Sequence, residues 1–260
     1  MPNHLWRTSI LVRLGLPLPH LRKQQHGCEC HDRYDVRVRG RTRRRRRPPP
    51  VDCFGEHDQR CPLTFTLGRH DEVQERALRP IIKAAGIHVS TSKVSELRRL
   101  DDNDDKSMRK GDLTTTGLYH DGKTILDVGI THPTIDTYIN NSSSEAPRGS
   151  AANIYANNKC RSANKIIEDK ELDVDFKAIT FTTFGGFGKA THDLITKLTS
   201  EATDYDFDPW ARPSPKSHAY LTFGFALARA NARMLINADS KRRSARNRVR
   251  TSRQRSTTPE

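Results

Sequence analysis

The chain has 260 residues, of which 34% are hydrophobic, and its formal net charge at pH 7 is +14. This length suits one domain of ordinary size with extensions, or two small domains, and the low apolar content excludes a compact core over the whole chain. No apolar run reaches the length of about eighteen residues that a transmembrane helix needs, so we expect no membrane partner. The apolar patch near the N-terminus is broken by Arg13 and by prolines, which makes it a poor signal peptide.

Two segments carry the positive charge. Residues 37–47 contain eight arginines and no acid, and residues 241–260 contain eight basic residues and one acid. These segments contribute +8 and +7, so the rest of the chain carries −1 of the total of +14. We expect flexible basic arms that bind DNA or RNA without sequence preference, mainly by releasing counterions. The alternative is a nuclear-localisation tract or a solvated tail; it is compatible with nucleic-acid binding, and we expect a nuclear protein.

The N-terminal part combines an expected arm over residues 1–25 with an irregular stretch over residues 26–68 that is rich in Cys, His and Arg. Five cysteines, an odd number, argue against a disulfide framework. The spacings Cys-x-Cys and His-x₃-Cys instead indicate a Cys₃His zinc site, whose ligands would be Cys28, Cys30, His57 and Cys61. Alternative ligands are Cys53, His31 and His26.

The arginine-rich residues 37–50 fall between the two halves of this predicted zinc module. Their composition cannot form a packed core, so we expect a disordered insertion there. The alternative to a zinc site is a set of free thiols in a loose loop. The fifth cysteine, Cys160, falls in a later predicted helix, where we expect it in the core.

Residues 69–204 are predicted to form the folded core. Apolar residues at helical spacing predict a helix over residues 70–85, with a kink at Pro80 and an end at Gly86. Further elements follow in the order strand, strand, strand, helix, strand and helix, over residues 87–94, two runs between 110 and 133, 151–169, 176–183 and 189–202. This order predicts an α/β (α+β) fold with a mixed central sheet and flanking helices. Beyond it we expect a linker and C-terminal helix over residues 205–240, with the helix ending near 238, and a basic disordered tail over residues 241–260.

Each of the two runs between residues 110 and 133 carries one aspartate, Asp112 and Asp127, with fourteen residues between them. Asp127 alternates with Leu126, Val128 and Ile130, so its side chain points away from an apolar row. A carboxylate in such a strand is costly unless it has a partner, and a second acid beside it adds repulsion unless a divalent cation lies between them. Two carboxylates that hold Mg²⁺ are typical of phosphodiester cleavage.

The register of the two runs decides whether a shared ion is feasible. A tight turn at Asp121-Gly122 would place Asp127 four positions from the residue opposite Asp112, on the order of 13 Å away. A wider loop from Gly117 to Gly122 would pair Asp112 directly with Asp127, so the metal hypothesis requires that loop. In the alternative without metal, Asp112 caps the start of its strand and Asp127 pairs with an Arg or Lys.

Lys159 interrupts the apolar stripe of the helix predicted over residues 151–169. Lysine avoids burial unless it has a partner, and a helix packed on the sheet could aim Lys159 at the two aspartates. There it could stabilise the charge that develops on a scissile phosphate, or orient the attacking water. In the alternative, Lys159 extends past the helix edge into solvent. Lys165, on the flank of the stripe, is the second candidate.

Taken together, these segments resemble the C-terminal region of non-LTR retrotransposon polyproteins and of related reverse-transcriptase-bearing elements of protists, fungi and algae. There, a Cys-Cys-His-Cys zinc knuckle precedes a restriction-like endonuclease of the PD-(D/E)xK superfamily. The resemblance covers roughly residues 8–238, and its matching segments are, in order, LVRLGLPLP, CEC, DCFGEHDQRC, GRHDEVQERALRPIIKAAG, KGD…TILDVGITHP, NNKCRSANK, FTTFGGFG and ALARANARML. Because no polymerase signature is present, the chain looks like a detached or truncated endonuclease region.

The resemblance implies a restriction-endonuclease-like core, Zn²⁺ at the four ligands proposed above, and Mg²⁺ or Mn²⁺ at Asp112 and Asp127. Lys159 would replace a lysine that the superfamily places two residues after the second acid, where this chain has Gly129. Gly111 stands where the superfamily has a proline, and His70 is expected to approach the site.

The implied activity is the nicking of target DNA for insertion of the element, by two-carboxylate Mg²⁺ catalysis. One alternative is a catalytically inactive fragment that binds nucleic acid through the zinc knuckle and the basic arms. Another is a cellular protein that uses the knuckle as a surface for protein interaction.

Overall fold

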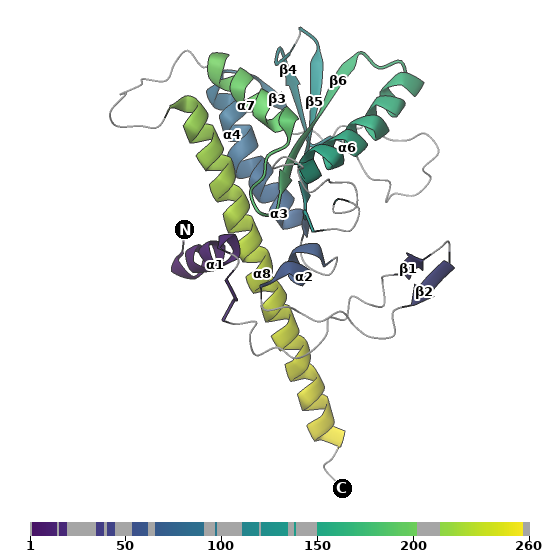
Figure 1. The fold of residues 1–260 in the computed structure, drawn as a ribbon, viewed down its shortest axis with the longest axis vertical. Helices are drawn as coiled ribbons and strands as arrows, with labels where there is room; N and C mark the ends of the chain where they lie inside the picture. The colour runs from purple at the N-terminus through teal and green to yellow at the C-terminus, as the bar shows by residue number, and fades with distance from the viewer. Residues whose placement is uncertain are drawn as a thin grey trace. The chain divides into compact units, whose positions relative to one another are not determined.

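The structure is a computed structural model, which describes residues 2–14, 16–19, 35–38, 41–44, 54–61, 66–90, 97, 111–119, 121–134, 138, 150–201 and 214–256. Figure 1 shows the helices and strands of the chain. The chain divides into two compact units. One consists of Met1–Arg69 with Ala228–Glu260, and the other of His70–Leu227. The second unit contains both predicted aspartates and Lys159.

A four-stranded mixed sheet forms the centre of the second unit. Its strands lie in the order β3 (Val89–Ser90), β4 (Leu113–Thr116), β5 (Lys123–Thr131) and β6 (Val174–Thr182). The first two pairings are antiparallel, and β5 pairs with β6 in parallel. The chain crosses from β5 to β6 through helix α6 (Ser150–Asp169), as a parallel pair requires a long connection. The predicted α/β class and the mixed sheet with flanking helices are therefore confirmed.

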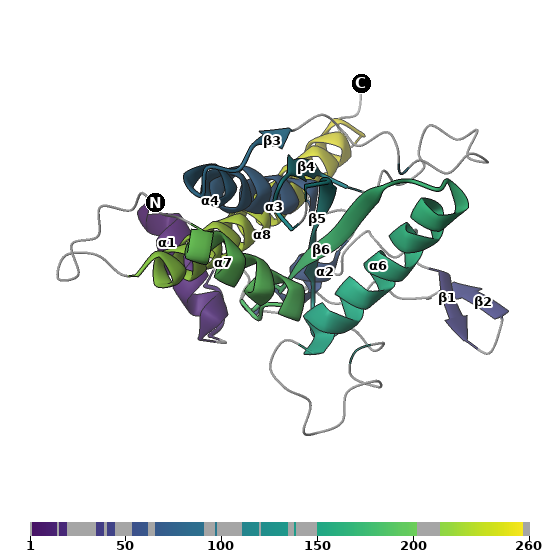
Figure 2. The same ribbon diagram turned by 90° about the horizontal axis from the view of Figure 1, so that it is seen from above.

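Helices cover both faces of this sheet, and each face has its own apolar cluster (Figure 2). Strand residues one position apart point to opposite faces. On one face, Ile125, Phe176 and Ala178 pack with the small residues Ala156 and Ala163 of α6. Cys160, predicted in the core, is only half-buried and packs against the margin of this cluster. On the other face, strand residues pack against the helices before β3, against α7 (Lys189–Glu201) and against the first part of α8 (Pro215–Ser256); they are Leu126, Val128, Ile179 and Phe181.

The helix predicted over residues 70–85 consists of three consecutive pieces, α3 (Thr66–Val73), the π-helical turn η2 (Gln74–Leu78) and α4 (Arg79–Ala84). Pro80 is the second residue of α4, separated from the π-helical turn only by Arg79. Proline has no N–H for the bond to the preceding turn, and its ring crowds the carbonyl four residues earlier, so a wider turn there removes both conflicts. Gly86 ends the helix with φ +74°, as predicted, and its N–H donates to the carbonyl of Lys83 at 3.0 Å.

Helix α8 is longer than the sequence predicted, because it continues from Pro215 to Ser256. Residues 225–256 are rich in Ala and Arg and contain neither Gly nor Pro, so nothing in the chain interrupts the helix. The stretch expected as a disordered tail is therefore helical up to Ser256. Among the residues that the structure describes, no helix combines the length and the apolar character that crossing a membrane requires.

The first unit contains α1 (Asn3–Arg13), α2 (Glu56–Arg60) and the later part of α8. Its small core joins these segments through Val12, Leu18, Cys61 and Leu235. Within the arginine-rich stretch, β1 (Asp35–Val38) pairs antiparallel with β2 (Arg41–Arg44), where the sequence predicted a disordered insertion from residue 37. Residues 45–50 of that insertion lie outside the described residues.

Candidate functional site

The register of β4 and β5 is the one that the metal hypothesis requires. Thr116 pairs with Lys123 and Leu113 with Leu126, so the connection is the wide loop and not a two-residue turn. Gly117 begins this loop with φ +77°, a conformation that favours glycine. The Asp112 N–H donates to the carbonyl of Leu126 at 2.8 Å, which continues the ladder and brings Asp112 beside Asp127.

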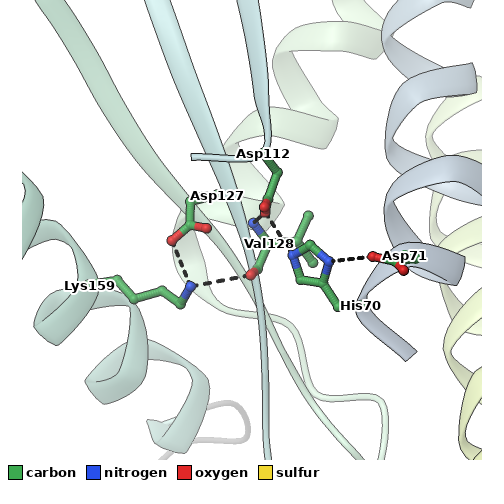
Figure 3. A network of polar contacts seen from close by, with 6 residues as sticks. All are labelled: His70, Asp71, Asp112, Asp127, Val128 and Lys159. Carbon is green, nitrogen blue, oxygen red and sulfur yellow. Dashed lines mark hydrogen bonds and ion pairs between the residues drawn. The ribbon is translucent and has the colours of Figure 1, made fainter. Parts of the chain in front are cut away.

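The two carboxylates lie close together on neighbouring inner strands of the sheet, with Asp112 directly before β4 and Asp127 in the middle of β5 (Figure 3). Asp127 is buried on the face of β5 that packs against α6, and Asp112 is half-buried at the start of β4. Asp112 Oδ2 accepts a hydrogen bond from the Val128 N–H at 2.6 Å. The register of the two strands places Asp112 opposite Asp127, and the charge of Asp112 acts on Asp127. Both predicted acids are therefore brought together.

Lys159 reaches this pair from α6. Its Nζ donates to Asp127 Oδ2 at 2.6 Å and to the carbonyl of Val128 at 3.3 Å. The prediction that the inward stripe of the helix aims Lys159 at the acids is confirmed. Lys165, the second candidate, is exposed on the same helix.

His70 lies on the opposite side of the pair, at the end of α3 (Figure 3). Its Nε2 is 2.8 Å from Asp112 Oδ2, and its Nδ1 is 3.3 Å from Asp71 Oδ1. The expected approach of His70 is confirmed, and Asp71 is a neighbour that the sequence analysis missed. The signal for Asp71 is only its position next to His70, because nothing in a sequence tells which way the ring turns.

Burial and neighbouring charges act on the two acids in opposite directions. Burial is the largest influence on Asp112 and opposes its charge, but His70, the Val128 N–H and Lys159 together hold the pKa of Asp112 below its ordinary value. Burial raises the pKa of Asp127, and the charge of Asp112 adds to this although Lys159 opposes it. Asp127 is therefore the acid whose charged form is less favoured, as expected where two carboxylates share one site.

The neighbouring acids raise the pKa of both basic groups, which favours their charged forms. Burial disfavours the charge on Lys159, but Asp127, Tyr155 and Asp112 together more than compensate, and the pKa of Lys159 is raised. Burial likewise disfavours a charge on His70, and Asp112 and then Asp71 raise the pKa of His70 above its ordinary value. The site thus consists of two neighbouring acid–base pairs, His70 with Asp112 and Lys159 with Asp127.

Gly111 and Gly129, the two positions flanking the candidate acids where the sequence analysis noted glycine, are each explained by local geometry. A Cβ at Gly129 would lie 2.7 Å from Tyr155 Cε1 and 3.0 Å from Lys159 Cε, so the room for a side chain there is already taken. Gly111 has φ +99°, which proline cannot adopt because its ring fixes φ near −65°. A lysine from the helix thus fills the space where a lysine from the strand would begin.

Two of the four predicted zinc ligands, Cys28 and Cys30, lie outside the described residues. The alternative ligands Cys53, His31 and His26 also lie outside them. His57 is half-buried in α2, and Cys61 is buried directly after it. Within the ranges that the structure describes, no three His, Cys, Asp or Glu side chains gather as a metal-binding group. The four-ligand zinc site stays a prediction.

The donor set of the candidate site suits a hard divalent cation. Carboxylate oxygens are the ligands that Mg²⁺ and Mn²⁺ prefer, and two carboxylates that repel each other gain from a cation between them. The ion pair of Asp127 with Lys159 is also what the alternative without metal predicts. That alternative does not predict the second pair, in which the Asp112 carboxylate contacts His70 beside the first pair.

No family model matches the chain, and neither the curated proteins nor the solved structures contain a significant match to it.

Proposed function

We propose that the chain is a metal-dependent DNA endonuclease region of a retroelement, which nicks target DNA by two-carboxylate catalysis in the nucleus. The convergence of Asp112, Asp127 and Lys159, from two adjacent strands and a packed helix, carries this proposal. The order of elements supports the restriction-endonuclease-like core that the resemblance implies, since a helical segment, three strands, a helix and a fourth strand follow one another.

Asp112 and Asp127 would hold Mg²⁺ or Mn²⁺ through their carboxylate oxygens. Such a cation polarises a scissile phosphate and lowers the pKa of a water molecule beside it. The protein's own groups then have separate tasks. The ammonium of Lys159, fixed at Asp127, can stabilise the negative charge that grows on the phosphate oxygens or orient the attacking water. His70 fixes the Asp112 carboxylate by its contact with Oδ2.

DNA or RNA would be held by the basic segments, and Zn²⁺ by Cys28, Cys30, His57 and Cys61 in the knuckle that the sequence predicts. Contacts of this kind depend on salt because they release counterions from the phosphate backbone. The second candidate, an inactive nucleic-acid-binding fragment, is favoured by the concentration of charge in residues 241–260, which carry eight basic residues and one acid. It differs from the first only in catalysis.

Supercoiled plasmid separates the two candidates. We expect the parental chain to convert it to the nicked form with Mg²⁺ or Mn²⁺, and Asp127→Ala to reduce the rate by at least about 1,000-fold, because one of the two carboxylates is lost. Equal cleavage by both proteins would reveal a contaminating nuclease. Salt-sensitive DNA retention without cleavage by either protein would support the inactive binding fragment and overturn the proposed activity.

A further inference from the structure

Tyr155 lies beside Lys159 and has no role in the catalysis proposed above. The two residues are four positions apart, so they lie on the same face of α6, one helical turn from each other. The Nζ of Lys159 is 5.4 Å from the centroid of the Tyr155 ring, within the range of a cation–π contact. Tyr155 is half-buried, as Lys159 is.

The ring and the lysine stem share the space over Gly129. Three atoms surround the position of a missing Cβ there, Tyr155 Cε1 at 2.7 Å, Lys159 Cε at 3.0 Å and Thr180 Cγ2 at 3.2 Å. Thr180 is fully buried, and its Oγ1 donates to the carbonyl of Ala152 at 3.0 Å, which fixes α6 against β6. The stem of Lys159 therefore crosses Gly129 between side chains that are themselves held in place.

A lysine that reaches the site from a helix needs neighbouring side chains that restrict its conformation. A lysine two positions after Asp127 in β5 would point to the same face of the sheet as Asp127, because strand side chains alternate between the two faces. Lys159 instead reaches Asp127 along a stem of four rotatable bonds, whose freedom must be restricted before the ammonium keeps one position. Because Gly129 has no side chain, its neighbours Tyr155 and Thr180 must restrict the lysine stem.

We propose that Tyr155 is a positioning residue, whose ring confines the stem of Lys159 over Gly129 and so fixes the ammonium at Asp127. The contact with Asp127 at 2.6 Å is the position it secures. This inference rests on the proposed function for its effect on catalysis, whereas its effect on the geometry of Lys159 is independent of any activity.

Carbon-13 NMR of lysine-labelled, metal-free protein tests the geometry. A methylene group beside an aromatic ring has a shifted proton resonance, so we expect a displaced and well-ordered ε-methylene signal, assigned to Lys159 by its absence in Lys159→Arg. The signal should persist in Tyr155→Phe, which keeps the ring, and should move to the position of mobile lysines in Tyr155→Leu. Tyr119→Leu is the matched control, because Tyr119 also has a lysine over its ring, Lys177 at 5.3 Å; it should leave the Lys159 signal unchanged.

Plasmid nicking tests the consequence. We expect Tyr155→Phe to stay within about 3-fold of the parental rate, and Tyr155→Leu to lower kcat about 10- to 100-fold with little change in KM for DNA. Tyr155→Met, a flexible apolar replacement without a ring, takes the place of the leucine variant if that one does not fold. An unchanged Lys159 signal in the variants without a ring, or loss of the signal in Tyr155→Phe, would overturn the inference. Absence of nicking by the parental chain would instead refute the proposed function. The NMR result would still decide the role of Tyr155, because it does not depend on activity.

Discussion

Replacing Lys159 by methionine is expected to remove plasmid nicking almost completely and to weaken the fold at the same time. Methionine fills much of the volume of the lysine stem but has no charge, so Asp127 loses its 2.6 Å partner. The side chains of this pair are 23% and 7% exposed, and removal of one partner from a buried pair costs about 3–5 kcal/mol. We expect a loss near the lower end, about 3 kcal/mol, because Asp127 can take up a proton. Loss of the ammonium should lower the nicking rate about 100-fold or more.

A double variant separates the two effects. Lys159→Met combined with Asp127→Asn leaves no unpaired charge, so we expect it to recover most of the free energy of unfolding, measured in urea, without recovering nicking. Lys165→Met is the matched control, because Lys165 is exposed on the same helix, and it should change neither quantity. Parental stability and parental nicking in Lys159→Met would show that the ion pair matters for neither folding nor catalysis.

The second large effect is expected for Gly129→Ala, the smallest possible change at the site. The new Cβ would lie 2.7 Å from the Tyr155 ring and 3.2 Å from the buried Thr180, and only Lys159 Cε, at 3.0 Å, belongs to a flexible chain. Lysine should therefore yield first, and a displacement of about 1 Å can lower a catalytic rate about 100-fold. Overpacking of this kind costs about 1–3 kcal/mol of stability.

The glycine prediction has an internal control. A Cβ at Gly122, in the loop between β4 and β5, would meet no atom of the described residues within 4 Å, so Gly122→Ala should leave stability and nicking unchanged. Nicking rates for both variants, with urea unfolding curves, check the prediction. A Gly129→Ala protein as active and as stable as the parental chain would mean that Lys159 does not need the position it occupies over Gly129.

Much of the candidate site follows from the sequence because its signals are local. Glycines at both ends of the wide loop favour the register that pairs the two acids, and an apolar stripe interrupted by one lysine identifies both the helix face and Lys159. The helix end at Gly86 follows from the conformational freedom of glycine in the same way. Each of these features depends on neighbours within a few residues.

The features that sequence analysis missed depend on the fold in three dimensions. The π-helical turn before Pro80 is one of several ways to relieve the same conflict, and a pattern of residues does not choose among them. The orientation of the His70 ring between Asp71 and Asp112 depends on a contact across 42 positions of sequence. The crowding over Gly129 arises only when α6 lies on β5 and β6, so the sequence alone does not show why this position has no side chain.

Binding of Mn²⁺ to the parental chain, followed by the loss of its electron paramagnetic resonance signal, tests the central claim that two carboxylates from adjacent strands hold one cation. We predict one tight site per chain, which disappears in Asp112→Asn and in Asp127→Asn but remains in Asp193→Asn, whose exposed carboxylate pairs with Lys189 away from these acids. Undiminished Mn²⁺ binding in both site variants, or no tight site in the folded parental chain, would contradict the account.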